Sequence, residues 1–173
     1  EVLIPSPYWV SYPEQVKICG GIPVILETSQ ETGFKITKEQ IESKCSNKTK
    51  ILVLNFPSNP TGSTYNREEL MQIAKVAQEK DLIVISDEIY DKIVYSGIKH
   101  VSFPELSDDA KERTILVNGV SKTYSMTGWR IGYAAGNPKV ISAMNNLSGQ
   151  STSNPTSISQ KAAIEAFSGT QEK

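Results

Sequence analysis

The sequence has few of the residues that disulfide-rich, metal-binding and membrane-spanning proteins depend on. Its 173 residues include two cysteines, Cys19 and Cys45, and one histidine, His100. These are too few for a disulfide framework or for a metal cluster with recognisable ligand spacing. The longest apolar runs have the length of a strand, far below the roughly 20 residues that a membrane span needs. We therefore expect a reducing, cytoplasmic setting, no metal and no membrane partner.

An excess of charge of either sign is also absent. Lys and Arg number 18 against 19 Asp and Glu, which leaves a net charge of -1. Such a balance excludes the basic character typical of nucleic-acid-binding proteins. Apolar residues make up 38% and charged residues 21% of the chain, as in ordinary globular proteins. A chain of this size buries roughly 70% of its unfolded surface, so we expect one domain with a substantial core.

Three short runs rich in β-branched and leucine residues carry the clearest strand signal: Lys50–Asn55, Leu82–Asp87 and Thr114–Asn118. They are apolar on both faces, as strands of a parallel sheet are when helices cover both sides. Helical spacing, capping pairs and terminating glycines predict helices near residues 11–19, 37–45, 66–80, 138–147 and 156–167. This alternation predicts an α/β fold with three layers around a doubly wound, mainly parallel sheet.

Polar side chains follow each of the three predicted strands. Asn59–Gly62 follows the first, Asp87–Tyr90 ends the second, and Ser121, Lys122 and Arg130 follow the third. Because ligands of such sheets bind beyond the carboxyl ends of the strands, we expect these groups to meet at one edge. Each motif alone is equally typical of a turn, a helix cap or a solvated loop. Together they supply an amine, a carboxylate, a phenol, a carboxamide and an anion-binding pair.

This set of groups is what pyridoxal phosphate (PLP) requires. The aldehyde of the cofactor needs a lysine amine, its pyridine nitrogen needs a carboxylate, and its phosphate needs cationic and hydroxyl donors. The segments Asn59–Gly62, Asp87–Tyr90 and Ser121–Tyr133 resemble those of the class I and II aminotransferases of fold-type I, in order and in spacing. With Pro7–Glu14, the chain resembles the bacterial and plastid-type aspartate aminotransferase subgroup over essentially its whole length.

The resemblance implies that residues 1–173 form part of the PLP-binding large domain, with the small C-terminal domain outside the chain. The chain begins at Glu1 rather than at a methionine, and Glu1–Ile4 already reads as a strand entering a core. We therefore expect an excised piece, and the resemblance implies that the full-length enzyme is a homodimer. Without the other parts of the site, the piece alone should be inactive.

The resemblance also implies a role for each candidate residue. Lys122 would hold PLP as a Schiff base and move the substrate proton, Asp87 would pair with the pyridine nitrogen, and Tyr90 would donate to the phenolic oxygen. Asn59 would contact the same oxygen or the substrate carboxylate. The remaining cofactor contacts would be Ser121 and Arg130 to the phosphate, and Trp9 to the ring face or the substrate. A loop anchor packed on the core is the alternative reading of Trp9.

We predict a PLP-dependent transamination between an amino acid, aspartate or a related one, and a 2-oxo acid. Another fold-type I enzyme, such as a lyase, a synthase or an aromatic or prephenate aminotransferase, would use the same residues. A non-catalytic PLP-domain module is a further alternative, which the intact set of candidate residues disfavours. A nucleotide-binding domain ranks lower, because neither a G-x-G-x-x-G nor a Walker A motif follows any predicted strand.

Overall fold

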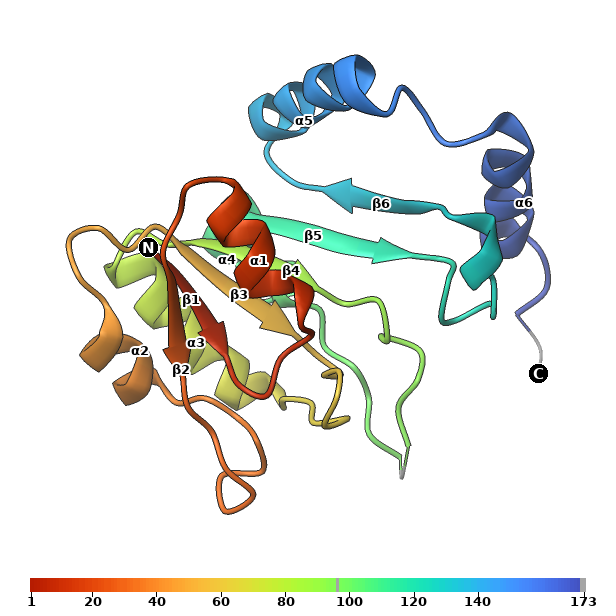
Figure 1. The fold of residues 1–173 in the computed structure, drawn as a ribbon. Helices are drawn as coiled ribbons and strands as arrows, with labels where there is room; N and C mark the ends of the chain where they lie inside the picture. The colour runs from red at the N-terminus through yellow and green to blue at the C-terminus, as the bar shows by residue number, and fades with distance from the viewer. Residues whose placement is uncertain (96, 172–173) are drawn as a thin grey trace.

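The three predicted strands form the centre of a six-stranded sheet in the computed structural model, which describes residues 1–95 and 97–171 (Figure 1). The order across the sheet is β2-β1-β3-β4-β5-β6. The strands are β1 (Val2–Pro5), β2 (Pro23–Leu26), β3 (Ile51–Asn55), β4 (Ile83–Asp87), β5 (Thr114–Gly119) and β6 (Gly132–Ala135). All neighbours pair in parallel except β5 and β6. The predicted mainly parallel α/β sheet is thus confirmed.

Two strands were not expected from the sequence. Both β2 and β6 have four residues, and β6 reads Gly-Tyr-Ala-Ala, a composition with low strand propensity. Pairing with β5 is what makes this segment a strand. Gly119 lies opposite Gly132, and a Cβ atom on Gly119 would lie 3.0 Å from the Cα of Gly132. Glycine at this position therefore permits the close approach of the two backbones.

The helices agree with the predicted segments to within a few residues. They are α1 (Ser11–Ile18), α2 (Lys38–Lys44), α3 (Arg67–Glu79), α4 (Asp108–Arg113), α5 (Pro138–Ser151) and α6 (Ser157–Ser168), with short 3₁₀ turns η1 (Phe103–Glu105) and η2 (Thr127–Trp129). The capping boxes at Thr37 and Asn66 are both formed. Only α4 was not predicted, and α5 runs four residues beyond the expected Leu147.

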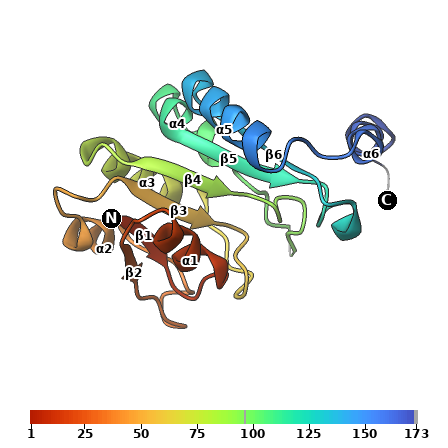
Figure 2. The same ribbon diagram turned by 45° about the horizontal axis from the view of Figure 1, so that its top comes forward.

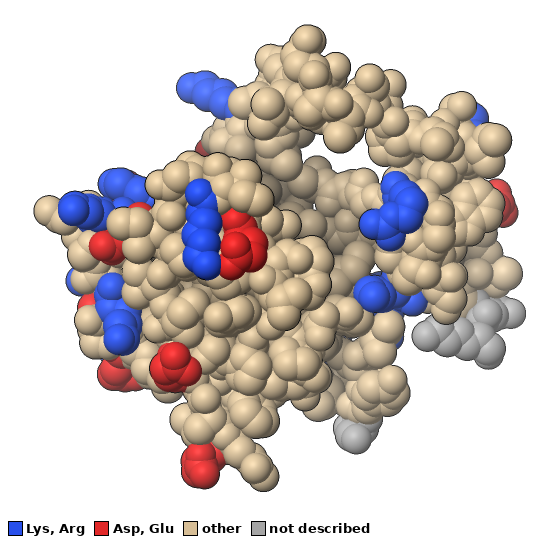
Figure 3. Space-filling view, in the orientation of Figure 1, with Lys and Arg blue, Asp and Glu red and all other residues tan. Residues whose placement is uncertain are grey.

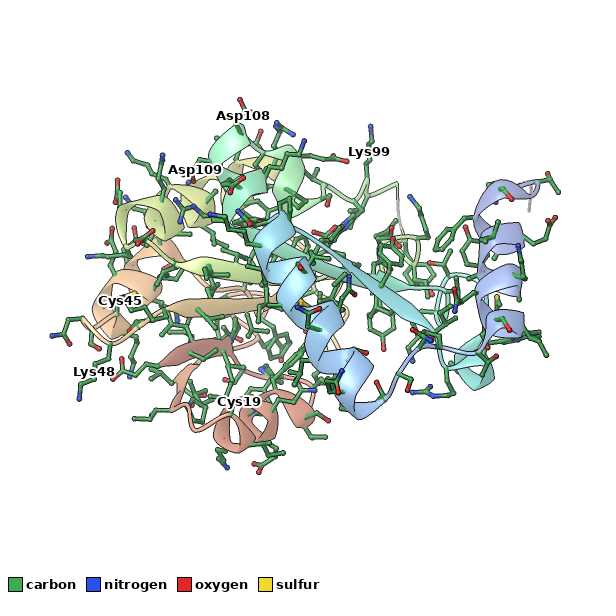
Figure 4. The ribbon with its side chains drawn as sticks, turned by 90° about the horizontal axis from the view of Figure 1, so that it is seen from above. Cys19, Cys45, Lys48, Lys99, Asp108 and Asp109 are labelled. Atoms are coloured by element: carbon green, nitrogen blue, oxygen red, sulfur yellow. The ribbon has the colours of Figure 1, made fainter. Side chains whose placement is uncertain are left out.

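Helices cover the sheet on both sides, as expected for three layers. The helices α2, α3 and α4 lie on one face and α1 lies on the other (Figures 1 and 4). Alternation along β3 matches this arrangement, because Leu52 and Leu54 belong to the main core beneath α2 and α3, whereas Val53 packs with Tyr12 on the α1 side. After β6 the chain continues through α5 and then reaches α6, which lies at one end of the molecule (Figure 2).

The two cysteines lie on opposite faces of the sheet. Cys19 follows α1, Cys45 follows α2, and both thiols are free (Figure 4). Among the helices of residues 1–95 and 97–171, none is long and apolar enough to cross a membrane.

Candidate active site

A cavity of about 470 Å³ lies beyond the carboxyl ends of β3, β4 and β5. All seven side chains selected from the sequence line it: Trp9, Asn59, Asp87, Tyr90, Ser121, Lys122 and Arg130. The surface is hollowed between the body that contains the sheet and the part formed by the C-terminal helices, with basic side chains at the rim (Figure 3). The parallel sheet thus brings together groups that are far apart in the sequence.

Asp87 is the last residue of β4, and its carboxylate is held at both oxygens. The Tyr12 hydroxyl donates to Oδ2 at 2.7 Å, and the Ile89 amide donates to Oδ1 at 3.2 Å. Burial nevertheless raises the pKa of Asp87 above its usual value, against the opposing effect of these two hydrogen bonds. A cationic donor placed at the free lone pairs of this carboxylate would offset the cost of burial.

Tyr12 is a site residue that the sequence reasoning did not select. Its ring is 8% exposed and packs edge-on against Trp9, with the ring centroids 5.4 Å apart. Burial and the neighbouring Asp87 carboxylate raise the pKa of Tyr12, so that the phenol stays protonated and acts as a donor. Tyr12 lies three residues after Trp9, within the first turn of α1. Residues three apart lie on the same face of a helix, so this spacing could have identified Tyr12 from the sequence as a neighbour of Trp9.

Asn55 connects the ends of β3 and β4. Its Nδ2 donates to the carbonyl oxygen of Asp87 at 3.1 Å, and its Oδ1 accepts from the amide of Asn59 at 2.8 Å. One side chain therefore fixes the start of the Asn59–Gly62 turn relative to Asp87. Its position at the end of a predicted strand could have identified it.

Lys122 and Tyr90 approach each other across the cavity. The Nζ atom of Lys122 lies 5.4 Å from the centre of the Tyr90 ring. Next along the chain, the Thr123 hydroxyl donates to Asp91 at 3.4 Å, which links the segment after β5 to the segment after β4. The amine and the phenol are thus held on neighbouring loops of the same cavity.

Arg130 lies at the turn from η2 into β6. Its φ angle of 51° puts it in the left-handed region, which a non-glycine residue rarely adopts and which is common at functional sites. Its Nη1 donates to the Thr127 carbonyl oxygen at 2.9 Å. The guanidinium therefore remains at the cavity, where Ser121 also lies.

Trp9 precedes α1 and is 41% exposed. Its indole lines the cavity and contacts Tyr12, the residue that bonds Asp87. A tryptophan that anchors a loop by packing on the core would be more buried than this.

Comparison with known proteins identifies the family. The sequence profile of the family "Aminotransferase class I and II" matches residues 1–173, which is the whole chain. The chain belongs to this family.

Relatives of this aminotransferase chain are longer than it is. Aspartate aminotransferase from Bacillus subtilis (strain 168) is 57% identical over 172 residues, and asparagine–oxo-acid transaminase from Streptococcus mutans is 50% identical over 172 residues. Both matches cover 99% of this chain and 44% of the relative. The crystal structure of the aspartate aminotransferase from Rhizobium meliloti superposes with a TM-score of 0.96 at 42% identity, over 99% of this chain and 43% of that one. The chain thus spans less than half the length of these relatives.

Proposed function

We propose that this chain forms part of the PLP-binding large domain of an aminotransferase that exchanges the amino group of aspartate, or of a related amino acid, with a 2-oxo acid. The observation that carries the proposal is the cavity itself, because seven side chains from four separate segments meet there. The names of the relatives support aspartate among the possible amino donors.

The donor and acceptor groups of the cavity fit PLP. When bound, the cofactor supplies an electron sink for the electrons released at the substrate α-carbon. A protonated ring nitrogen is the kind of cationic donor that the buried Asp87 carboxylate favours, since burial raises its pKa in the absence of a partner. Tyr12 keeps one oxygen of that carboxylate directed by a hydrogen bond. Asp87 would thereby hold the proton on the ring nitrogen.

Lys122 supplies the primary amine that a covalent linkage to the aldehyde carbon requires. Its Nζ would also take the proton from the substrate α-carbon and deliver it to C4′, the aldehyde carbon of the cofactor. Tyr90, whose ring lies 5.4 Å from that amine, would donate its hydroxyl proton to the phenolic oxygen of the cofactor. Asn59, fixed by Asn55, would bind the same oxygen or the substrate carboxylate.

The phosphate would bind to the Ser121 hydroxyl and the Arg130 guanidinium, both of which line the cavity. Charge-assisted hydrogen bonds from a guanidinium suit a phosphate group. Trp9 would cover the ring face or contact the substrate. Because these contacts leave one side of the cavity open (Figure 3), we propose that a second subunit and a further domain complete it in a homodimer. The free thiols of Cys19 and Cys45 support a reducing compartment such as the cytoplasm.

Reduction of the PLP-treated protein with borohydride tests the central assignment. In the complete protein, meaning the full natural sequence in which this chain occurs, we expect the cofactor mass on the peptide that contains Lys122. Lys122→Ala should lose this label, whereas Lys92→Ala, which changes an exposed lysine beyond Tyr90, should keep it. A label that persists on other lysines in Lys122→Ala, with Lys122 itself unmodified in the wild type, would contradict the proposal.

A further inference from the structure

Glu88 is a buried carboxylate to which the proposed reaction assigns no role. It follows Asp87 directly, is 2% exposed, and contacts Phe103, a residue of the main core. Its Oε1 accepts from the Ser86 hydroxyl at 2.7 Å and from the Phe103 amide at 3.0 Å, and its Oε2 is 2.8 Å from Nε2 of His100. We call these four residues the Glu88 clasp.

The clasp joins the two ends of one long loop. Ser86 and Glu88 lie at the end of β4, whereas His100 and Phe103 lie where the chain returns to the core at η1. Between them, the described residues 89–95 and 97–102 include no helix or strand. Loops longer than about 12 residues without regular structure are uncommon in compact domains and are often functional. The Glu88 carboxylate contacts residues at both ends of this loop.

The hydrogen bonds are strong enough to keep Glu88 ionised despite its burial. Burial alone would raise the pKa of Glu88, but the bonds from His100, Phe103 and Ser86 together hold it below its usual value. Nδ1 of His100 is buried without a hydrogen-bond partner among the described residues. Because Nε2 faces the carboxylate and Nδ1 has no acceptor in the described part of the chain, Nε2 is the ring nitrogen that donates to Glu88. The ring also packs against Phe56, directly after β3, with the centroids 5.4 Å apart.

The loop held by the clasp forms walls of the candidate site. Ile89 and Tyr90 line the 470 Å³ cavity, and Tyr90 with Asn59 separates it from an adjoining cavity of about 400 Å³. The far wall of the adjoining cavity is formed by later residues of the same loop: Ile93, Val94, Tyr95 and Ile98. The position of Tyr90 therefore depends on how the whole loop is held.

We propose that Glu88 and His100 are positioning residues, which fix the loop after β4 and thereby hold the Tyr90 hydroxyl where it meets the cofactor. The effect on the cofactor rests on the proposed function, whereas the effect on the loop does not. Glu88→Gln breaks the clasp without a change of size. The single amide oxygen of a glutamine can accept from the Phe103 amide or from Nε2 of His100, but not from both. If the oxygen faces Phe103, the NH2 group can donate to Nε2 only when the imidazole proton moves to Nδ1, where it would be buried without an acceptor.

Hydrogen exchange in the complete protein tests the effect on the loop. Glu88→Gln and His100→Asn should speed exchange of the peptides that cover residues 89–103 by roughly ten-fold or more, the effect of losing a hydrogen bond to a charged group. A glutamine at position 100 can place an amide donor near the position of Nε2. The same peptides should therefore exchange more slowly in His100→Gln than in His100→Asn. Glu105→Gln, an exposed carboxylate on η1, is the control for loss of charge. Circular dichroism establishes folding, and His100→Asn provides the test if Glu88→Gln does not fold.

The second arm measures the cofactor itself, by its dissociation constant and by the pH midpoint of its visible absorbance. Tyr90→Phe defines the shift that loss of the hydroxyl causes. We expect Glu88→Gln to shift the pH midpoint in the same direction. In a protein that already carries Tyr90→Phe, Glu88→Gln should cause almost no further shift. The inference would be overturned if the midpoint shifts of the two substitutions were fully additive, or if the loop of Glu88→Gln exchanged as slowly as that of Glu105→Gln. If the wild type binds no PLP, the proposed function fails, and hydrogen exchange alone decides whether the clasp holds the loop.

Discussion

Tyr12→Phe is the perturbation that most directly tests the electrostatics of the site. It removes one hydroxyl from a ring that is 8% exposed and leaves the packing against Trp9 in place. The hydroxyl donates to Oδ2 of Asp87 at 2.7 Å. Loss of this bond should raise the pKa of Asp87 further above its usual value, because the hydrogen bond favours the ionised form of the carboxyl group.

The size of the effect follows from the difference between two hydrogen bonds. A bond to an ionised group contributes about 1.5–3 kcal/mol, and one to a neutral group contributes about 0.5–1.5 kcal/mol. Their difference, about 1–1.5 kcal/mol, corresponds to an upward shift of the Asp87 pKa by roughly one pH unit. Near neutral pH, the free energy of unfolding should fall by the larger amount. Below the ordinary Asp value of 3.8, where Asp87 is protonated in both states, it should fall only by the smaller amount.

The sign of this dependence follows from linkage. The folded-state pKa of Asp87 lies above its ordinary value, so the folded state binds more protons and stability declines as the pH rises through that interval. Tyr12→Phe extends the interval upward. The ¹³C shift of the Asp87 carboxyl carbon reports its pKa in the cofactor-free complete protein, and urea unfolding at the two pH values reports stability. Tyr8→Phe, a hydroxyl removed from the same segment, is the control. An unchanged Asp87 pKa, or equal losses of stability at both pH values, would refute the reasoning.

Two further substitutions separate cofactor binding from chemistry. Asp87→Asn removes a carboxylate whose burial raises its pKa, so the cofactor-free protein should be no less stable near neutral pH. In the complete protein, turnover should fall much more than PLP occupancy. Near-normal turnover would mean that another group protonates the ring nitrogen. Arg130→Ala should mainly weaken PLP retention, by roughly ten- to hundred-fold for each charge-assisted hydrogen bond lost, as measured by cofactor loss on dialysis. Arg67→Ala, at the start of α3, is its control, and equal retention in the two variants would remove Arg130 from the phosphate site.

Local pattern and strand-end position were enough to predict much of this protein. The central strands β3, β4 and β5 were predicted because they are apolar on both faces, and α2 and α3 because their capping boxes lie in the sequence itself. Asn59, Asp87 and Lys122 were selected because parallel strands place their carboxyl ends at one edge. All of them line the cavity.

The strands at the sheet margins depended on partners rather than on their own residues. The segment Gly132–Ala135 has little strand propensity, and its place beside β5 comes from the approach of Gly132 to Gly119. The helix α4 is only six residues long, too short to give a clear period. Such elements form through pairing and packing with their neighbours, and a local pattern does not carry that information.

The sequence by itself determined the chemical groups of the site and the sheet edge where they meet, because both follow from local periodicity and from the geometry of parallel strands. Only the tertiary structure decided how those groups are held. The Tyr12–Asp87 bond joins residues 75 positions apart, and Glu88 contacts His100 across the loop that follows β4. Hydrogen bonds of this kind require the distance between side chains on different elements to be correct to within a few tenths of an ångström. No spacing along the chain encodes such distances, so the electrostatic environment of the site comes from packing.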